Sequence, residues 1–415
     1  MVDIKDLDRK LLFLVGPNGS GKTHALKQSM ENVDEKCILI TEDGNPLFVK
    51  KINKVIIDYE KALYSYTEEE QRGRGDRLLE EDEISVNSLN IIDFCYKKFK
   101  KLNQVINKSM GQEKLNNLLK ILLSYNLNNI KLFYFDEPEN FLDEEYLKEV
   151  ANLIRLLIEN EKVVRVVTHN SRLLRLLNVN LENIIVLKQY KQLSISSLKI
   201  KECYEEVREN IGTIVRNINA EESAQINYRL SFIDNDTLFE SFLNQYLKDE
   251  QFYRTLFYKE ILIVEGQSDI IALNHIKDSF DVSLEVFNPN GKTFIPFFVL
   301  LFNILGKNIR VVIDDDLENP TGARLKHPVA LTQYLKQLSE ELDFHLILHS
   351  PDLEGHYSMD LDSMARKFGM SNTIRNREKG MFKSLSSFDF FSQNENAERL
   401  KKHIFAIKDS SFELS

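Results

Sequence analysis

Residues Leu11 to Thr23, Leu-Leu-Phe-Leu-Val-Gly-Pro-Asn-Gly-Ser-Gly-Lys-Thr, decide the fold of the first part of this chain. The apolar residues at the start predict a short buried strand, and a helix is expected to begin at Lys22 and Thr23 after the glycine-rich turn. This is the G-x-x-x-x-G-K-[ST] spacing of a phosphate-binding loop (P-loop) between a strand and a helix. Main-chain N–H groups of such a loop, and the N-terminus of the helix, favour bound phosphate. The stretch therefore predicts a site for a nucleoside triphosphate.

The residue types of this loop suit the binding of ATP together with Mg²⁺. Lys22 is expected to reach the β- and γ-phosphates, and Thr23 is expected to be a ligand of Mg²⁺. A purely structural glycine turn is the alternative, and the complete set of fixed positions weighs against it. The loop residues expected to bind the cofactor are Gly16, Asn18, Gly19, Gly21, Lys22 and Thr23.

Composition narrows the class of protein. A chain of 415 residues is expected to form two or three domains, and its 43% hydrophobic and 28% charged residues are typical of a soluble globular protein. The net charge of −10 argues against binding nucleic acid over the whole surface, although it leaves room for a local basic groove. Cys37, Cys95 and Cys203 are too few and too widely spaced for a disulfide framework or a zinc site, which fits a reducing cytoplasm. No apolar run is long enough to span a membrane, so no membrane partner is expected.

A second apolar stretch, Leu132 to Phe135, ends in the acidic pair Asp136-Glu137. Asp136, at a strand end beside the P-loop, is expected to help hold Mg²⁺. Glu137 is expected to polarise the water that attacks the γ-phosphate. Pro138 follows and favours an extended main chain at Glu137, which would fix the direction of that side chain. The pair predicts hydrolysis of the bound nucleotide.

Two shorter signals accompany these motifs. Ser109 and Gly111 precede a predicted helix, where a serine alone would be read as a helix cap. Their position before the Asp-Glu strand makes a contact with nucleotide the favoured interpretation. His169 follows the predicted strand Val163–Val167, and at this strand end a contact with the γ-phosphate is favoured over a structural role.

Taken in order, GPNGSGKT, SMGQ, FDEPENFLD and VVTHN resemble the ATP-binding-cassette (ABC) ATPases, most closely the branch that acts in DNA repair and chromosome maintenance. In that family the signature serine and glycine act in trans, on nucleotide held by a second subunit. The resemblance implies that Ser109 and Gly111 complete the ATP site of another copy, in a homodimer or higher homo-oligomer joined through the ATPase heads. Lys108 stands where the signature usually has leucine, and Gln71 is the nearest candidate for the family's Q-loop glutamine.

Residues Ile261 to Asp269, Ile-Leu-Ile-Val-Glu-Gly-Gln-Ser-Asp, repeat the strand–turn–helix pattern with acidic side chains. Glu265 ends the predicted strand and Asp269 lies in the first helical turn, so both can face one point. Further on, the predicted strand Ile309–Ile313 runs into Asp314-Asp315-Asp316. Strands that alternate with helices predict a parallel sheet, whose carboxyl edge would collect these acids. Such crowded carboxylates predict Mg²⁺ or Mn²⁺ among them, although aspartates that only cap a turn are the alternative.

VEGQSD, NPNGKTF and VVIDDD resemble the Toprim domain of topoisomerases, primases and nucleases. An ABC-type ATPase followed by a Toprim domain is the arrangement of the overcoming-lysogenisation-defect (OLD) nucleases, including those of Gabija-type phage defence. The resemblance implies that Glu265, Asp314 and Asp316 are catalytic acids, and that a late lysine, Lys379 or Lys383, adds positive charge. The metal ligands that it implies in the Toprim domain are Glu265, Asp269, Asp314, Asp316 and Glu354.

The expected fold is α/β, with an ABC-type P-loop ATPase domain over residues 1–200, a helical connector or dimerisation segment over 201–258, and a Toprim domain with a Rossmann-like parallel sheet over 259–415. The expected activity is ATP-regulated cleavage or nicking of DNA in anti-phage defence, with ATP and Mg²⁺ in the first site and two Mg²⁺ or Mn²⁺ ions in the second. The basic residues between Arg366 and Lys383 are expected to contact phosphate. RNA as substrate and an accessory defence protein as partner are left open. The alternatives are an ATP-dependent sensor or clamp with a non-cleaving Toprim domain, and a topoisomerase- or primase-like enzyme.

Overall fold

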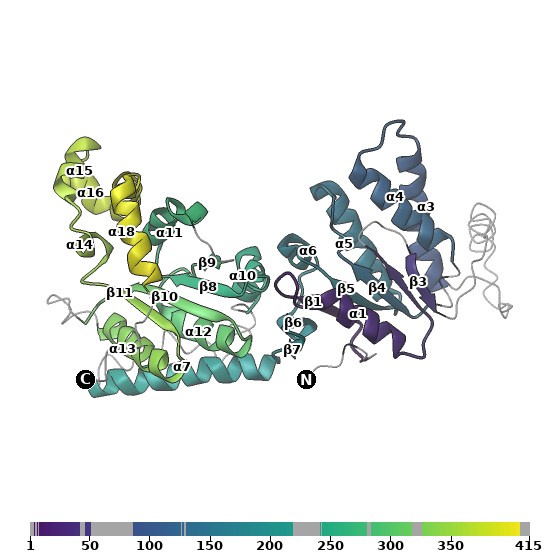
Figure 1. The fold of residues 1–415 in the computed structure, drawn as a ribbon, viewed down its shortest axis with the longest axis horizontal. Coiled ribbons are helices and arrows are strands. Elements are labelled where there is room, and N and C mark those ends of the chain that lie inside the picture. The colour runs from purple at the N-terminus through teal and green to yellow at the C-terminus, as the bar shows by residue number, and fades with distance from the viewer. Residues whose placement is uncertain are drawn as a thin grey trace. The chain divides into compact units, whose positions relative to one another are not determined.

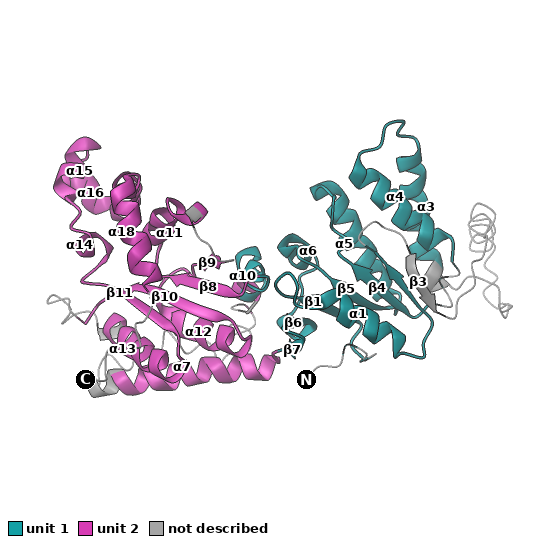
Figure 2. Ribbon diagram, in the orientation of Figure 1, with its two compact units in different colours: residues 1–194, 247–257 teal, residues 195–246, 258–415 magenta. Residues whose placement is uncertain are grey.

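The computed structural model describes residues 4, 6, 8–41, 46–50, 86–125, 127, 130–218, 241, 243–279, 284–317 and 326–406. The candidate Gln71 lies outside these ranges. The chain forms two compact units, one of residues 1–194 with 247–257 and one of residues 195–246 with 258–415 (Figure 2). None of the helices within the described ranges has the length and apolar character needed to span a bilayer.

The first unit is built on a seven-stranded sheet in the order β3-β2-β4-β5-β1-β6-β7 (Figure 1). Its strands are β1 (Leu11–Val15), β2 (Cys37–Ile40), β3 (Pro46–Lys50), β4 (Leu132–Asp136), β5 (Val163–Val167), β6 (Ile184–Lys188) and β7 (Lys191–Leu193). The central strands β2, β4, β5, β1 and β6 run parallel to one another. The edge strands β3 and β7 pair antiparallel with their neighbours. Since β4, β5 and β1 are neighbours, the loops that follow them meet at one edge of the sheet.

The helices of the first unit bury their apolar sides against this sheet or against one another. Leu12 and Leu14 of β1 pack with Leu26 and Met30 of the helix that follows the P-loop, which explains why the central strand is apolar throughout. These helices are α1 (Lys22–Glu31), α3 (Val86–Asn103), α4 (Met110–Leu123), α5 (Glu144–Glu159), α6 (Ser171–Leu176), the short 3-10 helix η2 (Leu181–Asn183) and α10 (Glu250–Thr255).

A buried arginine joins the start of the chain to the first sheet. Arg165 lies in the middle of β5 and is fully buried. Its guanidinium donates hydrogen bonds to the main-chain oxygens of Ile4 and Arg9, each over 2.8 Å, and to that of Asp6. Burial lowers the pKa of Arg165 to about 10, which leaves it charged at neutral pH. These main-chain acceptors compensate for the loss of water around the charge.

The second unit contains a four-stranded, fully parallel sheet in the order β11-β10-β8-β9. Its strands are β8 (Glu260–Val264), β9 (Leu284–Phe287), β10 (Asn308–Asp314) and β11 (His345–His349). Val264 of β8 pairs with Val312 of β10, so the next residues of both strands reach the same carboxyl edge. The α/β class expected from the sequence, with a sheet rich in parallel strands, is confirmed.

Helices cover both faces of the second sheet. Helices α7, α12 and α13 pack together on one face, while α11, α17 and α18 pack together on the other (Figure 1). Helix α12 is buried from Ile295 to Phe302 without a break, which explains its uniformly apolar sequence. The helices are α7 (Ser197–Ile218), the π-helical turn η4 (Leu243–Leu247), α11 (Gln267–Asn274), η5 (Lys277–Ser279), η6 (Lys292–Phe294), α12 (Ile295–Ile304), α13 (Lys326–Glu341), α14 (Leu353–His356), α15 (Leu361–Lys367), α16 (Asn372–Arg377), α17 (Lys379–Phe391) and α18 (Asn394–Phe405).

Candidate nucleotide and metal sites

The P-loop connects β1 to α1 and is pressed against the neighbouring strand. A side-chain carbon at Gly16 would lie 2.5 Å from the main-chain oxygen of Leu187 in β6, so only glycine fits there. Gly19 has a positive φ of 75° and nothing within 4 Å of where its side chain would stand. Asn18 is exposed beside it. The loop is therefore close-packed towards β6 at Gly16 and open at Gly19.

Lys22 lies buried beneath this loop. Its ammonium donates hydrogen bonds to the main-chain oxygens of Gly16, over 3.1 Å, and Pro17, over 3.0 Å. Burial lowers the pKa of Lys22 to about 8, against the opposing effect of the nearby acids Glu137 and Asp136. The buried hydroxyl of Ser20 has no hydrogen-bond partner in the described part of the chain. An unsatisfied hydroxyl and a lysine hydrogen-bonded to main-chain carbonyl oxygens suit a loop that receives phosphate oxygens.

The two residues expected to hold Mg²⁺ in this site are in contact. The hydroxyl of Thr23, in the first turn of α1, donates a hydrogen bond to Asp136 Oδ1 at the end of β4, over 3.1 Å. Both offer hard oxygen ligands of the kind that Mg²⁺ prefers. The donor set therefore fits the metal that the sequence predicts.

Glu137 is fixed by contacts on both of its carboxylate oxygens. Oε1 lies 3.3 Å from Nε2 of His169, and Oε2 accepts a hydrogen bond from the side-chain amide of Asn140 over 2.7 Å. Its main-chain N–H donates to the oxygen of Val167 over 2.9 Å. The expectation of an extended main chain at Glu137 is wrong, because its φ is 50° and this tertiary hydrogen bond outweighs the preference set by Pro138. Burial, together with the charge of Lys22, lowers the pKa of His169, so the imidazole is neutral at pH 7.

Sequence reasoning missed two buried residues that support Glu137 and His169. Lys114 of α4 donates to the main-chain oxygens of Glu137, over 3.0 Å, and Asn140, over 2.9 Å. Glu139 accepts hydrogen bonds from the hydroxyl of Thr168, over 2.6 Å, and from the main-chain N–H of His169, over 2.8 Å. Burial raises the pKa of Glu139, against these hydrogen bonds. The position of Lys114 on the apolar side of α4 was a sequence signal that its charge has a buried partner. No comparable local pattern marks Glu139.

Ser109 and Gly111 lie at the start of α4, away from the P-loop of their own chain. Ser109 caps the helix: Gln112 donates its main-chain N–H to the hydroxyl over 3.3 Å, and Gln112 Oε1 accepts from Ser109 over 3.0 Å. A side-chain carbon at Gly111 would lie 2.7 Å from the main-chain oxygen of Phe141, which requires glycine. Among the described contacts, none links Ser109 or Gly111 to residues 16–23 of the same chain.

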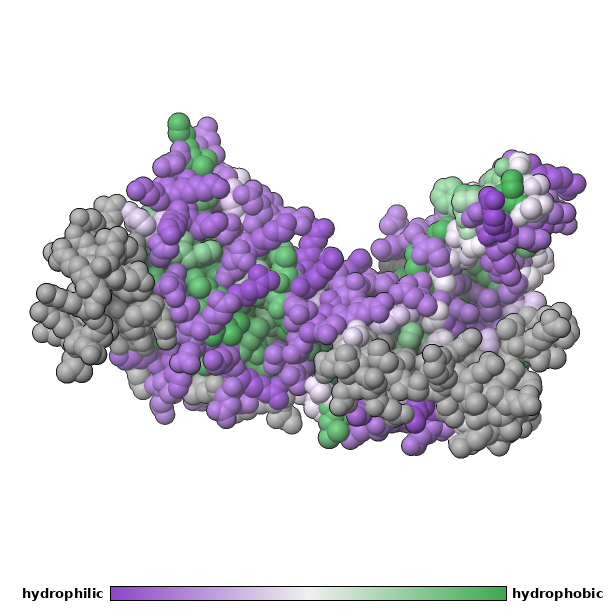
Figure 3. Space-filling model, turned by 180° about the vertical axis from the view of Figure 1, so that it is seen from behind, coloured by the Kyte–Doolittle hydropathy of each residue, from purple (hydrophilic) through white to green (hydrophobic). Residues whose placement is uncertain are grey.

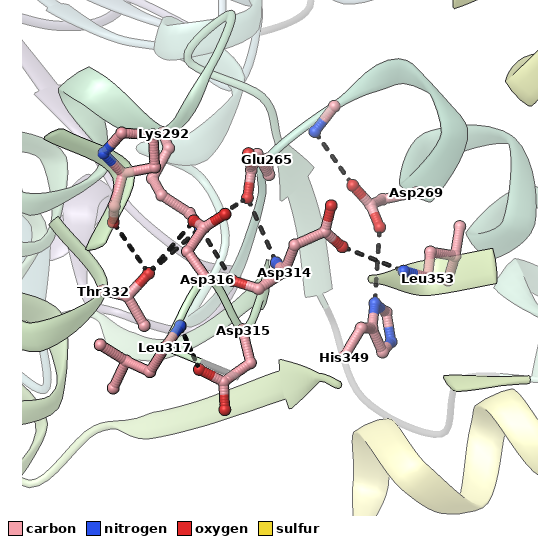
Figure 4. Close-up of polar contacts among 12 residues, drawn as sticks. Glu265, Asp269, Lys292, Asp314, Asp315, Asp316, Leu317, Thr332, His349 and Leu353 are labelled. Atoms are coloured by element: carbon pink, nitrogen blue, oxygen red, sulfur yellow. Dashed lines mark hydrogen bonds and ion pairs between the residues drawn. The ribbon is translucent and has the colours of Figure 1, made fainter. Parts of the chain in front are cut away.

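The acids of the second unit gather at the carboxyl edge of its sheet (Figure 4). Glu265 follows β8, and its Oε2 accepts a hydrogen bond from the main-chain N–H of Asp314 over 3.2 Å. Asp314 Oδ1 accepts from the N–H of Leu353 over 3.0 Å, and Asp269 Oδ2 accepts from that of Gly266 over 3.0 Å. The structure therefore brings Glu265, Asp269 and Asp314 to one edge of the sheet.

The electrostatics of this edge show a concentration of negative charge. Burial, and then the nearby charge of Glu265, raises the pKa of Asp314 to about 8. Burial, with the charges of Glu265 and Glu354, raises the pKa of Asp269 to about 7, although the hydrogen bond from Gly266 opposes this rise. Each acid holds its proton more tightly, first because burial disfavours its charged form and then because neighbouring carboxylates repel that charge, and a bound cation would offset both effects.

The aspartates after β10 point to different partners. Asp316 contacts Lys292, the lysine of the NPNGKTF stretch, for which the sequence alone indicated no role. Lys292 is buried and also lies 3.2 Å from Glu265 Oε2. Asp315 instead accepts a hydrogen bond from the N–H of Leu317 over 3.2 Å (Figure 4). The alternation of side chains thus separates Asp315 from the other acids.

The structure distinguishes the two candidate late lysines. Lys383 Nζ donates to Glu354 Oε2 over 2.7 Å, while Lys379 is exposed at the start of α17. Burial acts to lower the pKa of Lys383, but the hydrogen bond and the charge of Glu354 outweigh it and raise the pKa. Glu354 is buried, and its other oxygen, Oε1, has no hydrogen-bond partner among the described residues.

The donor chemistry of this edge fits a hard divalent cation, although the side chains are not arranged around one. Within the described ranges, no group of three or more histidine, cysteine, aspartate or glutamate side chains has the spacing of a metal site. The donors are carboxylate oxygens, two of the acids have raised pKa values, and Glu354 Oε1 lacks a partner.

Comparison with known proteins gives a partial likeness to ATP-binding cassettes. No protein-family model and no curated protein matches the chain. The dimeric structure of MJ0796, a bacterial ABC transporter cassette, is 18% identical over 45% of this chain and 86% of that chain, with a TM-score of 0.27. A post-hydrolysis dimer of MJ0796 with ADP and Pi is 19% identical over the same shares, with a TM-score of 0.27. CbiO1 from Clostridium perfringens, part of the ABC transporter complex cbiONQ, is 15% identical over 51% of this chain and 86% of that chain, with a TM-score of 0.28. At these low values, function has to be inferred from the geometry of the sites.

Proposed function

We propose that the first unit is an ABC-type ATPase. The observation that carries this proposal is the contact of Thr23 with Asp136, next to Glu137 and on the same sheet edge as the P-loop. The P-loop amides and Lys22 bind the triphosphate, and Thr23 and Asp136 hold Mg²⁺, which supplies charge stabilisation when bound. Glu137, oriented by Asn140 and His169, accepts the proton of the attacking water.

A second copy of the chain is the proposed partner of this unit. Apolar side chains stand exposed beside Ser109: Met110 is 65% exposed and Phe141 is 60% exposed. Figure 3 shows further apolar surface at the tip of the α3–α4 connection, at the upper left, where Ile106 is 96% exposed. Exposed apolar side chains around a helix N-terminus suit a surface that closes on bound nucleotide and on another subunit. In this proposal Ser109 and Gly111 contact the ATP that the second copy holds.

The second unit is the proposed nuclease, of OLD type, whose cutting of DNA is regulated by ATP and serves anti-phage defence. Glu265, Asp314 and Asp316 are its catalytic acids, with Asp269 and Glu354 as further metal ligands. Two divalent ions, when bound, supply a water of lowered pKa and stabilise the leaving oxygen. Lys383 adds positive charge near Glu354. The raised pKa values of Asp269 and Asp314 support a cation at this edge.

The basic segment from Arg366 to Lys383 is the proposed DNA-contacting surface, but part of its charge is already paired. Lys367 lies 2.5 Å from Asp389, and Arg375 lies 2.6 Å from Asp362. Arg377 pairs with Glu378 over 3.0 Å. Exposed ion pairs of this kind are weak, so phosphate groups can compete for the same cations.

A second candidate function is an ATP-dependent nucleic-acid clamp whose acid site does not cleave. The observation in its favour is that Lys292 forms ion pairs with Glu265 and Asp316, two of the acids that would bind metal. Cleavage of DNA under any divalent metal would exclude this candidate.

Both proposals are tested with full-length protein and supercoiled plasmid, in Mg²⁺ or Mn²⁺, with and without ATP. Glu265→Gln should abolish nicking and linearisation while ATP hydrolysis continues. Glu137→Gln should still bind ATP but should hydrolyse it more slowly, by a factor on the order of 10²–10⁴. Glu395→Gln, at an exposed position of α18, is the matched control and should change neither activity. A Glu265→Gln protein that still cuts DNA would overturn the metal-site assignment.

A further inference from the structure

We infer that Lys292 is the internal cation of the acid site: its ammonium holds Glu265 and Asp316 in place without metal, and a divalent ion at these acids binds against its charge. The inference rests on the proposed metal site and assigns a positioning role to a residue that the nuclease mechanism does not use.

The ammonium of Lys292 is fully engaged by the acid site. It donates to the main-chain oxygen of Asp314 over 2.8 Å, to Thr332 Oγ1 over 3.2 Å, and to Asp316 Oδ2. It also lies 3.2 Å from Glu265 Oε2 (Figure 4). A lysine ammonium has three N–H donors, and these neighbours satisfy all of them. Lys292 therefore connects the end of β8 with the residues that follow β10.

The position of Lys292 in the fold directs it to these partners. It begins η6, directly after Gly291, whose φ of 121° turns the chain between β9 and α12. The hydroxyl of Thr332, which is fully buried in α13, accepts a hydrogen bond from the Lys292 ammonium. The same hydroxyl lies 3.4 Å from Asp316 Oδ2. Lys292 and Thr332 thus hold Asp316 from two elements, which limits the directions in which its carboxylate can point.

Burial distinguishes this lysine from a second one beside the same aspartates. The side chain of Lys292 is 5% exposed, whereas that of Lys336, whose Nζ lies 3.7 Å from Asp315 Oδ2, is 39% exposed. Water screens the Lys336 pair, so its contribution is small. Glu265 and Asp316 are partly buried, with side chains 29% and 19% exposed, and both contact the ammonium of Lys292, so its loss leaves two neighbouring carboxylates without the attraction that offsets their desolvation. Removal of Lys292 should therefore affect the protein far more than removal of Lys336.

The proposed role predicts effects of opposite sign on two quantities. Without metal, loss of the ammonium leaves Glu265 and Asp316 to repel each other, so the folded state is less stable. With metal, loss of the ammonium removes a positive charge from beside the ion, so the ion binds more tightly. A lysine that served only to pack the site would weaken both stability and metal binding.

The test uses Lys292→Met and Lys336→Met in full-length protein stripped of metal with EDTA. Melting temperature is measured by circular dichroism, and Mn²⁺ affinity is measured from the electron paramagnetic resonance signal of free Mn²⁺. Lys292→Met should lower the metal-free Tm and tighten Mn²⁺ binding by about ten-fold or more. Lys336→Met should change neither. A Lys292→Met protein with unchanged Tm, or with weaker Mn²⁺ binding than the wild type, would overturn the inference.

A double variant keeps the test decisive if Lys292→Met does not fold. Lys292→Met with Asp316→Asn removes the cation together with one of the charges it neutralises, so it should fold with a higher Tm than Lys292→Met alone. Where Lys292→Met folds, additive effects of the two substitutions on Tm would contradict the inference; where it does not fold, a double variant that also fails to fold would contradict it. If the wild type binds no Mn²⁺ at all, the proposed metal site fails, while the metal-free double-mutant cycle still decides whether Lys292 is an internal cation.

Discussion

The buried ammonium of Lys114 donates a hydrogen bond to the main-chain oxygen of Glu137 over 3.0 Å. The same ammonium donates to the oxygen of Asn140, whose side chain holds the Glu137 carboxylate. Lys114 belongs to α4, the helix that begins after Ser109. The proposed base and the helix proposed to meet a second copy are therefore joined by one side chain.

Lys114→Met should slow ATP hydrolysis more than it weakens ATP binding, because the Glu137 turn loses its support while the P-loop keeps its contacts. The loss of stability should be about 1–3 kcal/mol, as expected for hydrogen bonds made by a charged group. Turnover, ATP affinity and urea unfolding measure the three quantities. Lys120→Met, on the exposed side of α4, is the matched control. Equal turnover in the two variants would contradict the role of Lys114.

Binding of ATP should be accompanied by proton uptake at Lys22 in mildly alkaline solution. The pKa of Lys22 is lowered from 10.5 to about 8, so at pH 8.5 most of this side chain is neutral in the nucleotide-free protein. A triphosphate favours the charged form and raises the pKa again. Calorimetric titrations of ATP in buffers of different ionisation enthalpy should show uptake at pH 8.5 and less at pH 7.

The same shift fixes the sign of a stability effect. Since the folded-state pKa of Lys22 lies below its unfolded value, the folded protein binds fewer protons between about pH 8 and pH 10.5. The contribution of Lys22 to stability therefore rises with pH across this window.

For the proton uptake that accompanies ATP binding, two variants give the control. Lys22→Arg should abolish the uptake, whereas Lys27→Met, on the exposed side of α1, should preserve it.

Lys383→Met should reduce DNA cleavage strongly, and Lys379→Met should not. Lys383 contacts buried Glu354, so its removal deletes a positive charge at the acid site and leaves a buried carboxylate without a cation. A loss on the order of 10²–10³-fold is expected for a group that stabilises developing negative charge. Initial rates on supercoiled plasmid measure it. Lys379 begins the same helix and is exposed, which makes it a matched control; the assignment fails if both variants lose activity equally.

Met110→Glu should prevent the proposed ATP-dependent association of two copies through their first units. The substitution places a charge on an exposed apolar side chain beside Ser109, where the second copy is proposed to close. Light scattering after gel filtration, in a Glu137→Gln background with ATP, should report a monomer. Leu198→Glu is the control, because Leu198 is 68% exposed, comparable to Met110 at 65%, but lies on α7. Dimers of the Met110→Glu protein would argue against this surface.

The candidate sites could be predicted from the sequence where a residue follows an apolar strand. Asp136, Glu265 and Asp314 each come at the end of such a strand, and parallel strands bring their carboxyl ends to one edge. The α/β class follows from the same alternation of strands and helices. Local spacing was sufficient for these features because each is set by the residue's own strand.

Residues held by distant partners could not be predicted in this way. Lys292 contacts groups 22 to 40 positions away in the chain, and Lys114 contacts groups 23 and 26 positions away. Their roles arise only when the elements pack together. The conformation of Glu137 escaped prediction for the same reason, because its N–H is held by Val167 of the neighbouring strand.

The hydrogen bonds of the Arg165 guanidinium limit which sequence changes the start of the chain can accept. Its partners near the start of the chain, Ile4, Asp6 and Arg9, are contacted through their main-chain oxygens. Any amino acid supplies the same oxygen, so a substitution at the partly exposed Asp6 costs little. Ile4 is different, because its side chain is 3% exposed and packs in the core of the first unit. A deletion or insertion there, in contrast, would shift the oxygens away from a charge fixed in the middle of β5. The hydrogen bonds to Arg165 thus constrain the spacing of Ile4, Asp6 and Arg9 along the chain more than they constrain the identity of those residues.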